Sequence, residues 1–217
     1  MARRLRRQRG IVVSRFLGVG AVLAVIAFLA TELYLATLPS VAGAPARVQA
    51  LLTQHGGLPV STPPTRVAAA TVAVEDRRFY VHHGLDSLGL LRAGWDVVTT
   101  GSPHGGATIT EQLAQALYVT TDDSLGSHLE KAGLAVKLEQ RYSKQAILTM
   151  YLNAVYYGDG QWGIAQASHA YFGVAPTALS WGAASMLAGL PNAPSAYDPR
   201  HHYTLARERE RLVLIAL

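Results

Sequence analysis

Two adjacent carboxylates, Glu75 and Asp76, stand at the end of an apolar segment of the sequence (VAAATVAV). The next residues are rich in cationic, aromatic and imidazole groups: Arg77, Arg78, Phe79, Tyr80, His82 and His83. A carboxylate at the end of an apolar element is partly removed from water, which raises its pKa towards the range that suits proton transfer. Glu75 is therefore a candidate general base. A surface cluster of ion pairs with the two arginines is the alternative interpretation of this segment alone.

Other reaction classes lack the residues that they need. None of the three lysines, Lys131, Lys137 and Lys144, has a serine three positions earlier, so the sequence holds no Ser-x-x-Lys nucleophile for penicillin-type transpeptidation. The sequence also has no Gly-Lys pair for a phosphate-binding loop and no His-Glu-x-x-His pattern for zinc. Penicillin-type transpeptidation is thus excluded, and the sequence gives no support for binding of nucleoside triphosphates or of structural zinc.

The elements that must position Glu75 show helical spacing. Apolar residues repeat at the helical period between residues 88 and 98, and Thr108 with Glu111 has the spacing of a capping box at a helix start. Further helices are predicted over residues 125–141, 143–157, 163–172, 180–190 and 204–217. No alternating run indicates a strand, so the fold is predicted to be mainly α.

The N-terminus differs in charge from the rest of the chain. Six arginines within residues 1–15 account for the net charge of +5, and the remainder is nearly neutral, so nucleic acid is not an expected partner. Residues 16–38 are almost uncharged and span about 34 Å as a helix, enough for a hydrocarbon core of about 30 Å. We predict a transmembrane anchor over 16–38 with a cytoplasmic tail over 1–15. A signal peptide cleaved near residues 42–44 is the alternative.

The chain beyond the anchor has the composition of a folded protein. Half of the 217 residues are hydrophobic, only 15% are charged and none is cysteine, which excludes a disordered chain and a disulfide scaffold. Residues 39–64 are rich in proline and glycine near both ends and predict a stalk. The folded domain is predicted to occupy residues 65–217.

Several spaced motifs together resemble those of a known family. The first is Glu-Asp-x-x-Phe-x-x-His-x-Gly from Glu75, the second is GGATITEQLA over residues 105–114, and another is YLNAVYYG over residues 151–158. LAGLP over residues 187–191 and the stretch 207–214 continue the match in register. In this combination they resemble the peptidoglycan glycosyltransferases, glycosyltransferase family 51. The likeness is greatest to the stand-alone, membrane-anchored type without a transpeptidase domain.

The resemblance implies a lysozyme-like helical domain behind one N-terminal transmembrane helix. It implies an enzyme of cell-wall biogenesis and cell shape that polymerises lipid II on the outer face of the bacterial cytoplasmic membrane. The C4 hydroxyl of the acceptor sugar would attack C1 of the donor with inversion and expel undecaprenyl pyrophosphate, and Glu75 would take the acceptor proton. No organic cofactor is implied. The implied partners are lipid II, the growing glycan strand, the bilayer and other cell-wall synthesis proteins.

The resemblance also assigns substrate contacts to residues of the matching motifs. They are Asp76, Phe79, His82, Thr108, Thr110, Gln112 and Asn153. Basic groups that the family has are missing here, and Lys131, Lys137 and Arg141 are expected to substitute for them in binding the substrate. A breaker-rich stretch over residues 101–106 is predicted to form a flap over the cleft. A further set of apolar residues is interpreted either as a lipid contact or as core packing: Leu85, Leu88, Leu90, Leu91 and Trp95.

The third motif of the family, Arg-Lys-x-x-Glu, is altered in this chain. Counted without gaps, it falls on Ser127, His128 and Lys131. In the family its glutamate is the second active-site carboxylate and engages the pyrophosphate directly or through a divalent cation. Glu130 is the nearest carboxylate here, turned by about 100° on a helix, and is the candidate second catalytic residue. A need for Mg²⁺ or Mn²⁺ stays open, and Lys131 is expected to neutralise the diphosphate that a metal ion otherwise would.

Two other functions stay open at this point. The altered third motif fits a catalytically weak scaffold that binds lipid II or glycan. A lysozyme-like hydrolase is the other alternative, and inverting hydrolysis would need a second carboxylate about 6.5–9.5 Å from the first to hold a water molecule.

Overall fold

The computed structural model describes residues 2–86, 107–119 and 124–217. These residues form helices and loops, and their only strand-like pairings are two isolated bridges, His83 with Leu85 and Tyr156 with Trp162. The prediction of a mainly α fold is confirmed. The chain divides into two compact units, Met1–Pro39 and Ser40–Leu217.

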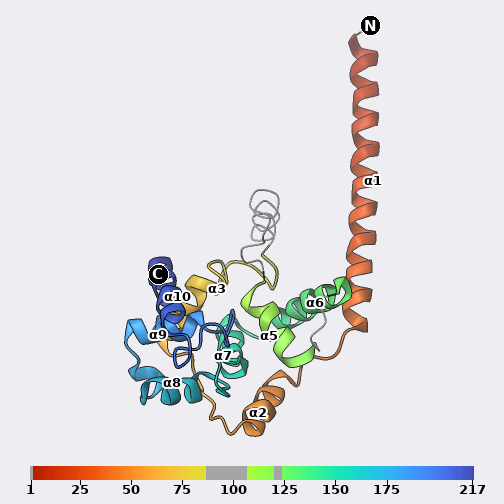
Figure 1. Ribbon diagram of the computed structural model, residues 1–217. Helices are drawn as coiled ribbons and strands as arrows, with labels where there is room; N and C mark the ends of the chain where they lie inside the picture. Colours follow the sequence, from red (N-terminus) through yellow and green to blue (C-terminus); the bar gives the residue numbers. More distant parts are fainter. Residues whose placement is uncertain (1, 87–106, 120–123) are drawn as a thin grey trace. The chain divides into compact units, whose positions relative to one another are not determined.

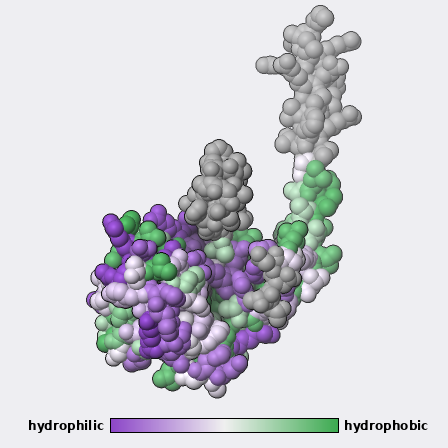
Figure 2. Space-filling view, in the orientation of Figure 1, coloured by the Kyte–Doolittle hydropathy of each residue, from purple (hydrophilic) through white to green (hydrophobic). Residues whose placement is uncertain are grey.

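The first unit is a single helix, α1 (Ala2–Thr37). Within the described residues its part Gly20–Thr37 is the one helical stretch long and apolar enough to cross a membrane, and 6% of that stretch is buried. Figure 2 shows hydrophobic residues along this stretch. By length and composition, α1 is therefore a candidate membrane helix that overlaps the predicted anchor.

Helix α2 (Ala44–Gln54) lies within the segment that was expected to be a stalk. It packs against α5 (Ile109–Tyr118) and α7 (Lys144–Ala154). Ala44, Val48 and Leu52 are buried because the spacing of four residues places them on one face of the helix. Proline- and glycine-rich stretches flank this short apolar pattern, so the sequence did not predict a helix here.

Helices α3 (Thr65–Glu75), α9 (Trp181–Gly189) and α10 (Tyr203–Ala216) pack on one another and lie together in Figure 1. Their contact contains Ala70, Ala188 and Val213, all buried, with Val74 packed against them. Small side chains on α3 and α9 let the helix backbones come close. This packing fixes the end of α3, where Glu75 is the last helical residue.

A second group consists of α5, α6 (Leu125–Arg141) and α7, with α8 (Ile164–Phe172) and the short η1 (Pro176–Ala178) beyond it. Helices α6, α7 and α9 begin after serine N-caps, each accepting a hydrogen bond from a backbone N–H of the first turn. The predicted helices from residue 125 onwards are all present. Helix α7 ends at Ala154, earlier than the predicted 157. The predicted helix over 88–98 lies outside the described residues.

Candidate active site

Glu75 is held by a chain of buried hydrogen bonds. Its side chain is only 6% exposed. The Gln112 amide Nε2 donates to Glu75 Oε2 at 2.8 Å, and the Tyr151 hydroxyl donates to Gln112 Oε1 at 3.0 Å. Because Tyr151 donates to the amide oxygen, the amide nitrogen of Gln112 faces the carboxylate. One oxygen of Glu75 is therefore fixed in direction by groups from α5 and α7.

The other oxygen of Glu75 has a different environment. Glu75 Oε1 is buried and accepts no hydrogen bond from the described residues, and Arg209 of α10 places a guanidinium nitrogen 3.8 Å from it. Burial raises the pKa of Glu75 above its usual value, although the Gln112 hydrogen bond and the Arg209 charge oppose this effect and the charge of Asp76 adds to it. Glu75 thus combines a raised pKa with an uncommitted oxygen, as a general base requires.

The two arginines next to this acidic pair in sequence contact other groups. Arg78 forms an ion pair with Asp86 at 2.9 Å, and Arg77 donates to the backbone oxygen of Ala216 at 3.3 Å. The alternative of an exposed cluster of ion pairs around Glu75 is therefore not what the structure shows.

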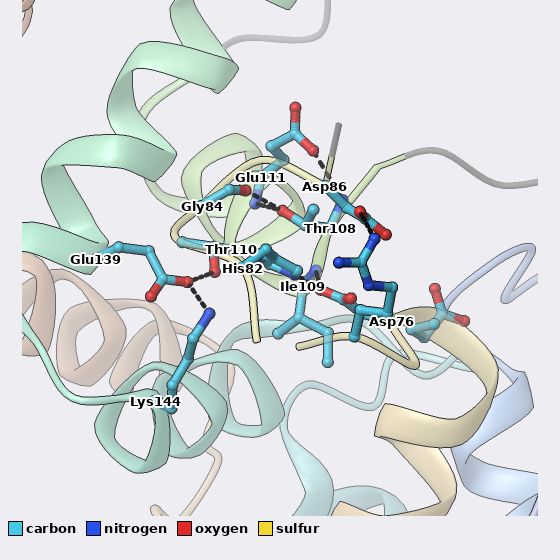
Figure 3. Close-up of polar contacts among 12 residues, drawn as sticks. Asp76, His82, Gly84, Asp86, Thr108, Ile109, Thr110, Glu111, Glu139 and Lys144 are labelled. Carbon is cyan, nitrogen blue, oxygen red and sulfur yellow. Dashed lines mark hydrogen bonds and ion pairs between the residues drawn. The ribbon is translucent and has the colours of Figure 1, made fainter. Parts of the chain in front are cut away.

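Asp76 links the end of α3 to the start of α5. Its buried Oδ2 accepts hydrogen bonds from the Ile109 backbone N–H at 3.2 Å and from His82 Nε2 at 2.8 Å (Figure 3). The other ring nitrogen, His82 Nδ1, is buried without a hydrogen-bond partner among the described residues. Asp76 holds the helix that carries Gln112.

Thr108 and Glu111 form the predicted capping box. The Thr108 backbone N–H donates to Glu111 Oε2 at 2.8 Å, and the Glu111 N–H donates to Thr108 Oγ1 at 3.1 Å. The Thr108 hydroxyl also donates to the Gly84 backbone oxygen at 2.7 Å (Figure 3). Gly84 has φ +94°, and a Cβ there would lie 3.1 Å from the backbone of Ala135, so this motif glycine permits close approach to α6.

Thr110 belongs to a second polar cluster, which was not predicted from the sequence. Its hydroxyl donates to Glu139 Oε1 at 2.6 Å, and Lys144 Nζ contacts the same oxygen at 2.7 Å (Figure 3). The Lys144 ammonium also lies 4.5 Å from the ring centre of the buried Phe79. Phe79 and Thr110 are thereby tied to α6 and α7, and their predicted substrate contacts stay predictions.

The remaining predicted residues of α6 lie at the helix surface or partly below it. Glu130, Lys131 and Lys137 are half-buried and Arg141 is exposed. The charge of Lys131 lowers the pKa of Glu111, the neighbour of Gln112 on α5, against a larger rise from burial.

Asn153 contacts the backbone of Val60, and its predicted substrate contact stays a prediction. Its side-chain amide pairs with both backbone groups of Val60, each at 2.9 Å. Among the described residues no three His, Asp or Glu side chains gather as a metal ion would require. A need for Mg²⁺ or Mn²⁺ stays a prediction. Leu88, Leu90, Leu91, Trp95 and the predicted flap over 101–106 lie outside the described residues.

Tyr151 and Arg209 are the site residues that sequence reasoning missed. Both fall within stretches that match the family, but nothing in their local spacing indicates a contact with the Glu75 environment. Their places depend on the packing of α7 against α5 and of α10 against α3.

Comparisons with known proteins identify the family of the chain. The family model described as Transglycosylase matches residues 48–217. Penicillin-binding protein 1F of Bacillus subtilis is 41% identical over 152 residues, which cover 70% of this chain and 21% of the relative. Penicillin-binding protein 1A of Aquifex aeolicus is 40% identical over the same length, with the same coverage. This chain thus matches about a fifth of the length of these penicillin-binding relatives.

A relative of more similar length is a protein of Cupriavidus necator that is named as a transglycosylase. It is 36% identical over 195 residues, which cover 90% of this chain and 81% of the relative. Together with the family match over most of the chain, these findings show that the chain belongs to the transglycosylase family, glycosyltransferase family 51, whose members are the glycosyltransferases of peptidoglycan synthesis.

Proposed function

We propose that this chain polymerises lipid II into glycan strands, with Glu75 as the general base. The observation that carries the proposal is the state of the Glu75 carboxylate. It is buried with a raised pKa, one oxygen is fixed by Gln112, and the other accepts no hydrogen bond from the described residues. A positioned base of this kind contributes about 10²–10⁴ in rate.

The reaction breaks and forms one bond at the donor sugar. The C4 hydroxyl oxygen of the acceptor attacks C1 of the donor, and its proton passes to Glu75 Oε1. The bond from C1 to the pyrophosphate oxygen breaks with its electron pair, and undecaprenyl pyrophosphate leaves. Attack from the face opposite the leaving group inverts the configuration at C1.

The leaving diphosphate needs positive charge to stabilise its developing oxyanions. Lys131, Lys137 and Arg141 of α6 supply it in our proposal, and Lys131 is the central one because its charge already acts on Glu111 beside Gln112.

The arrangement gives little support to hydrolysis. A water molecule for inverting hydrolysis needs a second, available carboxylate. The Asp76 carboxylate is buried and engaged by Ile109 and His82, so it is not available to activate water beside Glu75.

The apolar part of α1 suits a lipid-linked substrate. We propose that Gly20–Thr37 spans the cytoplasmic membrane with the basic N-terminus inside, so that the Ser40–Leu217 unit works on the outer face. Holding the enzyme in the plane of its substrate raises their effective concentration. Other cell-wall synthesis proteins are proposed as partners on the same face.

A direct assay with labelled lipid II tests the proposal. The full chain in detergent is compared with Glu75→Gln, which keeps the shape of the side chain, and with Glu208→Gln, which alters an exposed carboxylate on α10. We expect polymer from the parent and the control, and at least about 100-fold less from Glu75→Gln. Binding of lipid II without polymer would favour a scaffold, and cleavage of preformed glycan would favour a hydrolase; either result would contradict the proposal.

A further inference from the structure

The cation nearest to Glu75 comes from the end of the chain. Arg209 lies on α10, and its guanidinium nitrogen is 3.8 Å from Glu75 Oε1, with side chains that are 19% and 6% exposed. We propose that Arg209 is a positioning residue that acts through Glu75, by keeping the carboxylate ionised while leaving Oε1 open to the acceptor proton. This inference rests on the proposed function of Glu75.

The distance of 3.8 Å is important for this role. It exceeds the length of a hydrogen bond, so Arg209 does not occupy a lone pair of Oε1. Its charge nevertheless acts strongly across a buried gap, because little water screens it. A closer bidentate contact would make the anion more stable but would cover the oxygen that must receive the proton.

The guanidinium of Arg209 is held by groups other than Glu75. Its Nε donates to the Gly189 backbone oxygen at 3.4 Å, and its carbon lies 5.9 Å from the ring centre of Tyr197. A Cβ on Gly189 would come within 2.7 Å of Arg209 Cγ. The last residue of α9 therefore leaves the space through which the Arg209 side chain passes. In this way α10 places the positive charge of Arg209 beside the end of α3.

The other groups that act on Glu75 cannot replace this charge. Gln112 is neutral, and Asp76 carries a charge of the same sign. Tyr151 and Tyr157 stay protonated, because burial and the Glu75 charge raise the pKa of both phenols. Among the described groups, Arg209 is the cation that offsets the burial of Glu75.

The pH profile of polymerisation tests this role. Loss of the Arg209 charge raises the pKa of Glu75, and only the ionised form accepts a proton, so the acid limb of kcat/KM moves to higher pH. For Arg209→Gln we expect a displacement of about 1 pH unit and hence about tenfold lower activity on the acid limb. Arg209→Lys keeps a positive charge and should retain most of the parent's acid limb. Arg211→Gln, an exposed change on the same helix, should match the parent.

A lower plateau with an unmoved acid limb in Arg209→Gln would show a merely structural role and overturn the inference. So would an acid limb in Arg209→Lys that moves as far as in Arg209→Gln. If the parent itself makes no polymer, the proposed function fails instead, and the two failures are thereby distinguished.

A second measurement needs no activity. The thermal unfolding midpoint is compared for Arg209→Gln in the parent and in the Glu75→Gln background, with the full chain in detergent at pH 7. In the parent the substitution leaves a buried carboxylate without its cation, whereas in the Glu75→Gln background no such charge exists. We expect a larger fall in the midpoint in the parent, by several degrees. Equal falls would show that the two residues are not coupled and would overturn the inference.

Discussion

The end of α3 and the surface of α6 represent two differently built halves of the proposed reaction site. At the end of α3, Glu75 is buried and fixed by partners from α5, α7 and α10. On α6, Lys131 and Lys137 are half-buried and Arg141 is exposed. The half that would accept the proton matches the family closely in sequence, whereas the half that would meet the diphosphate is altered in its motif. The chain thus combines a fixed base with a changed set of charges for the leaving group.

The largest effect is expected from breaking the support of the Glu75 half. Asp76→Ala removes the acceptor of Ile109 N–H and His82 Nε2, both of which lose a charge-assisted hydrogen bond. Leaving such buried groups unpaired costs about 2–4 kcal/mol. We expect a clear fall in the thermal unfolding midpoint and loss of polymerisation. His83→Ala, a change of an exposed neighbour, is the control, and an unchanged midpoint for Asp76→Ala would contradict the linking role.

The next effect tests whether the α6 half takes part at all. Lys131→Ala removes the cation that we assign to the diphosphate, and turnover of lipid II by the purified chain should fall about tenfold or more. The position of the acid limb should stay close to that of the parent, because Lys131 does not act on Glu75. Unchanged turnover would remove Lys131 from the mechanism.

A smaller effect is expected one step away from the base. Tyr151→Phe deletes the hydroxyl that donates to Gln112 Oε1, so the amide loses one of the bonds that orient it. The net value of such a bond is about 1 kcal/mol, which corresponds to a fall in kcat/KM of about fivefold. Tyr203→Phe, at an exposed tyrosine of α10, serves as the matched control. A loss as large as that of Glu75→Gln would mean that Tyr151 has a direct chemical role.

The smallest effect is expected from a change at Glu111, which is next to Gln112 in sequence and is affected by the charge of Lys131. Glu111→Gln can keep the capping box, since either side chain accepts from the Thr108 N–H. It also removes the carboxylate on which the Lys131 charge acts, but this effect on Glu111 is smaller than those of burial and of the Thr108 hydrogen bonds. We expect less than a twofold change in turnover and less than about 0.5 kcal/mol in stability. A larger loss of turnover would indicate that the Glu111 and Lys131 charges operate as a pair.

Most of the features that could be predicted depend on residues that are close together in the sequence. The capping box at Thr108 and the serine at position 143 lie within one helical turn of the groups that they bind, so their spacing indicates the helix starts directly. The candidate base was also predictable, because Glu75 ends an apolar run. The Ala44–Gln54 helix was not, since its short apolar face is flanked by helix breakers.

Contacts between distant segments could not be predicted in the same way. Arg209 reaches Glu75 only because α10 packs on α3 and because Gly189 leaves room for it. Glu139 gains its partners from Thr110 and Lys144 on two other helices. The periodicity of a single segment does not indicate such contacts between distant segments. These contacts nevertheless determine the electrostatics of the site.

The pairing of Asn153 with Val60 has a practical consequence for shortening the protein. The amide of Asn153 satisfies the backbone of the connection that leads from α2 to α3, and both hydrogen bonds are lost if the chain is trimmed to position 65, because Val60 is removed. The 4%-exposed amide would then lose its partners inside the fold. A soluble fragment for crystallisation should accordingly begin near Ser40, before the first helix of the second unit.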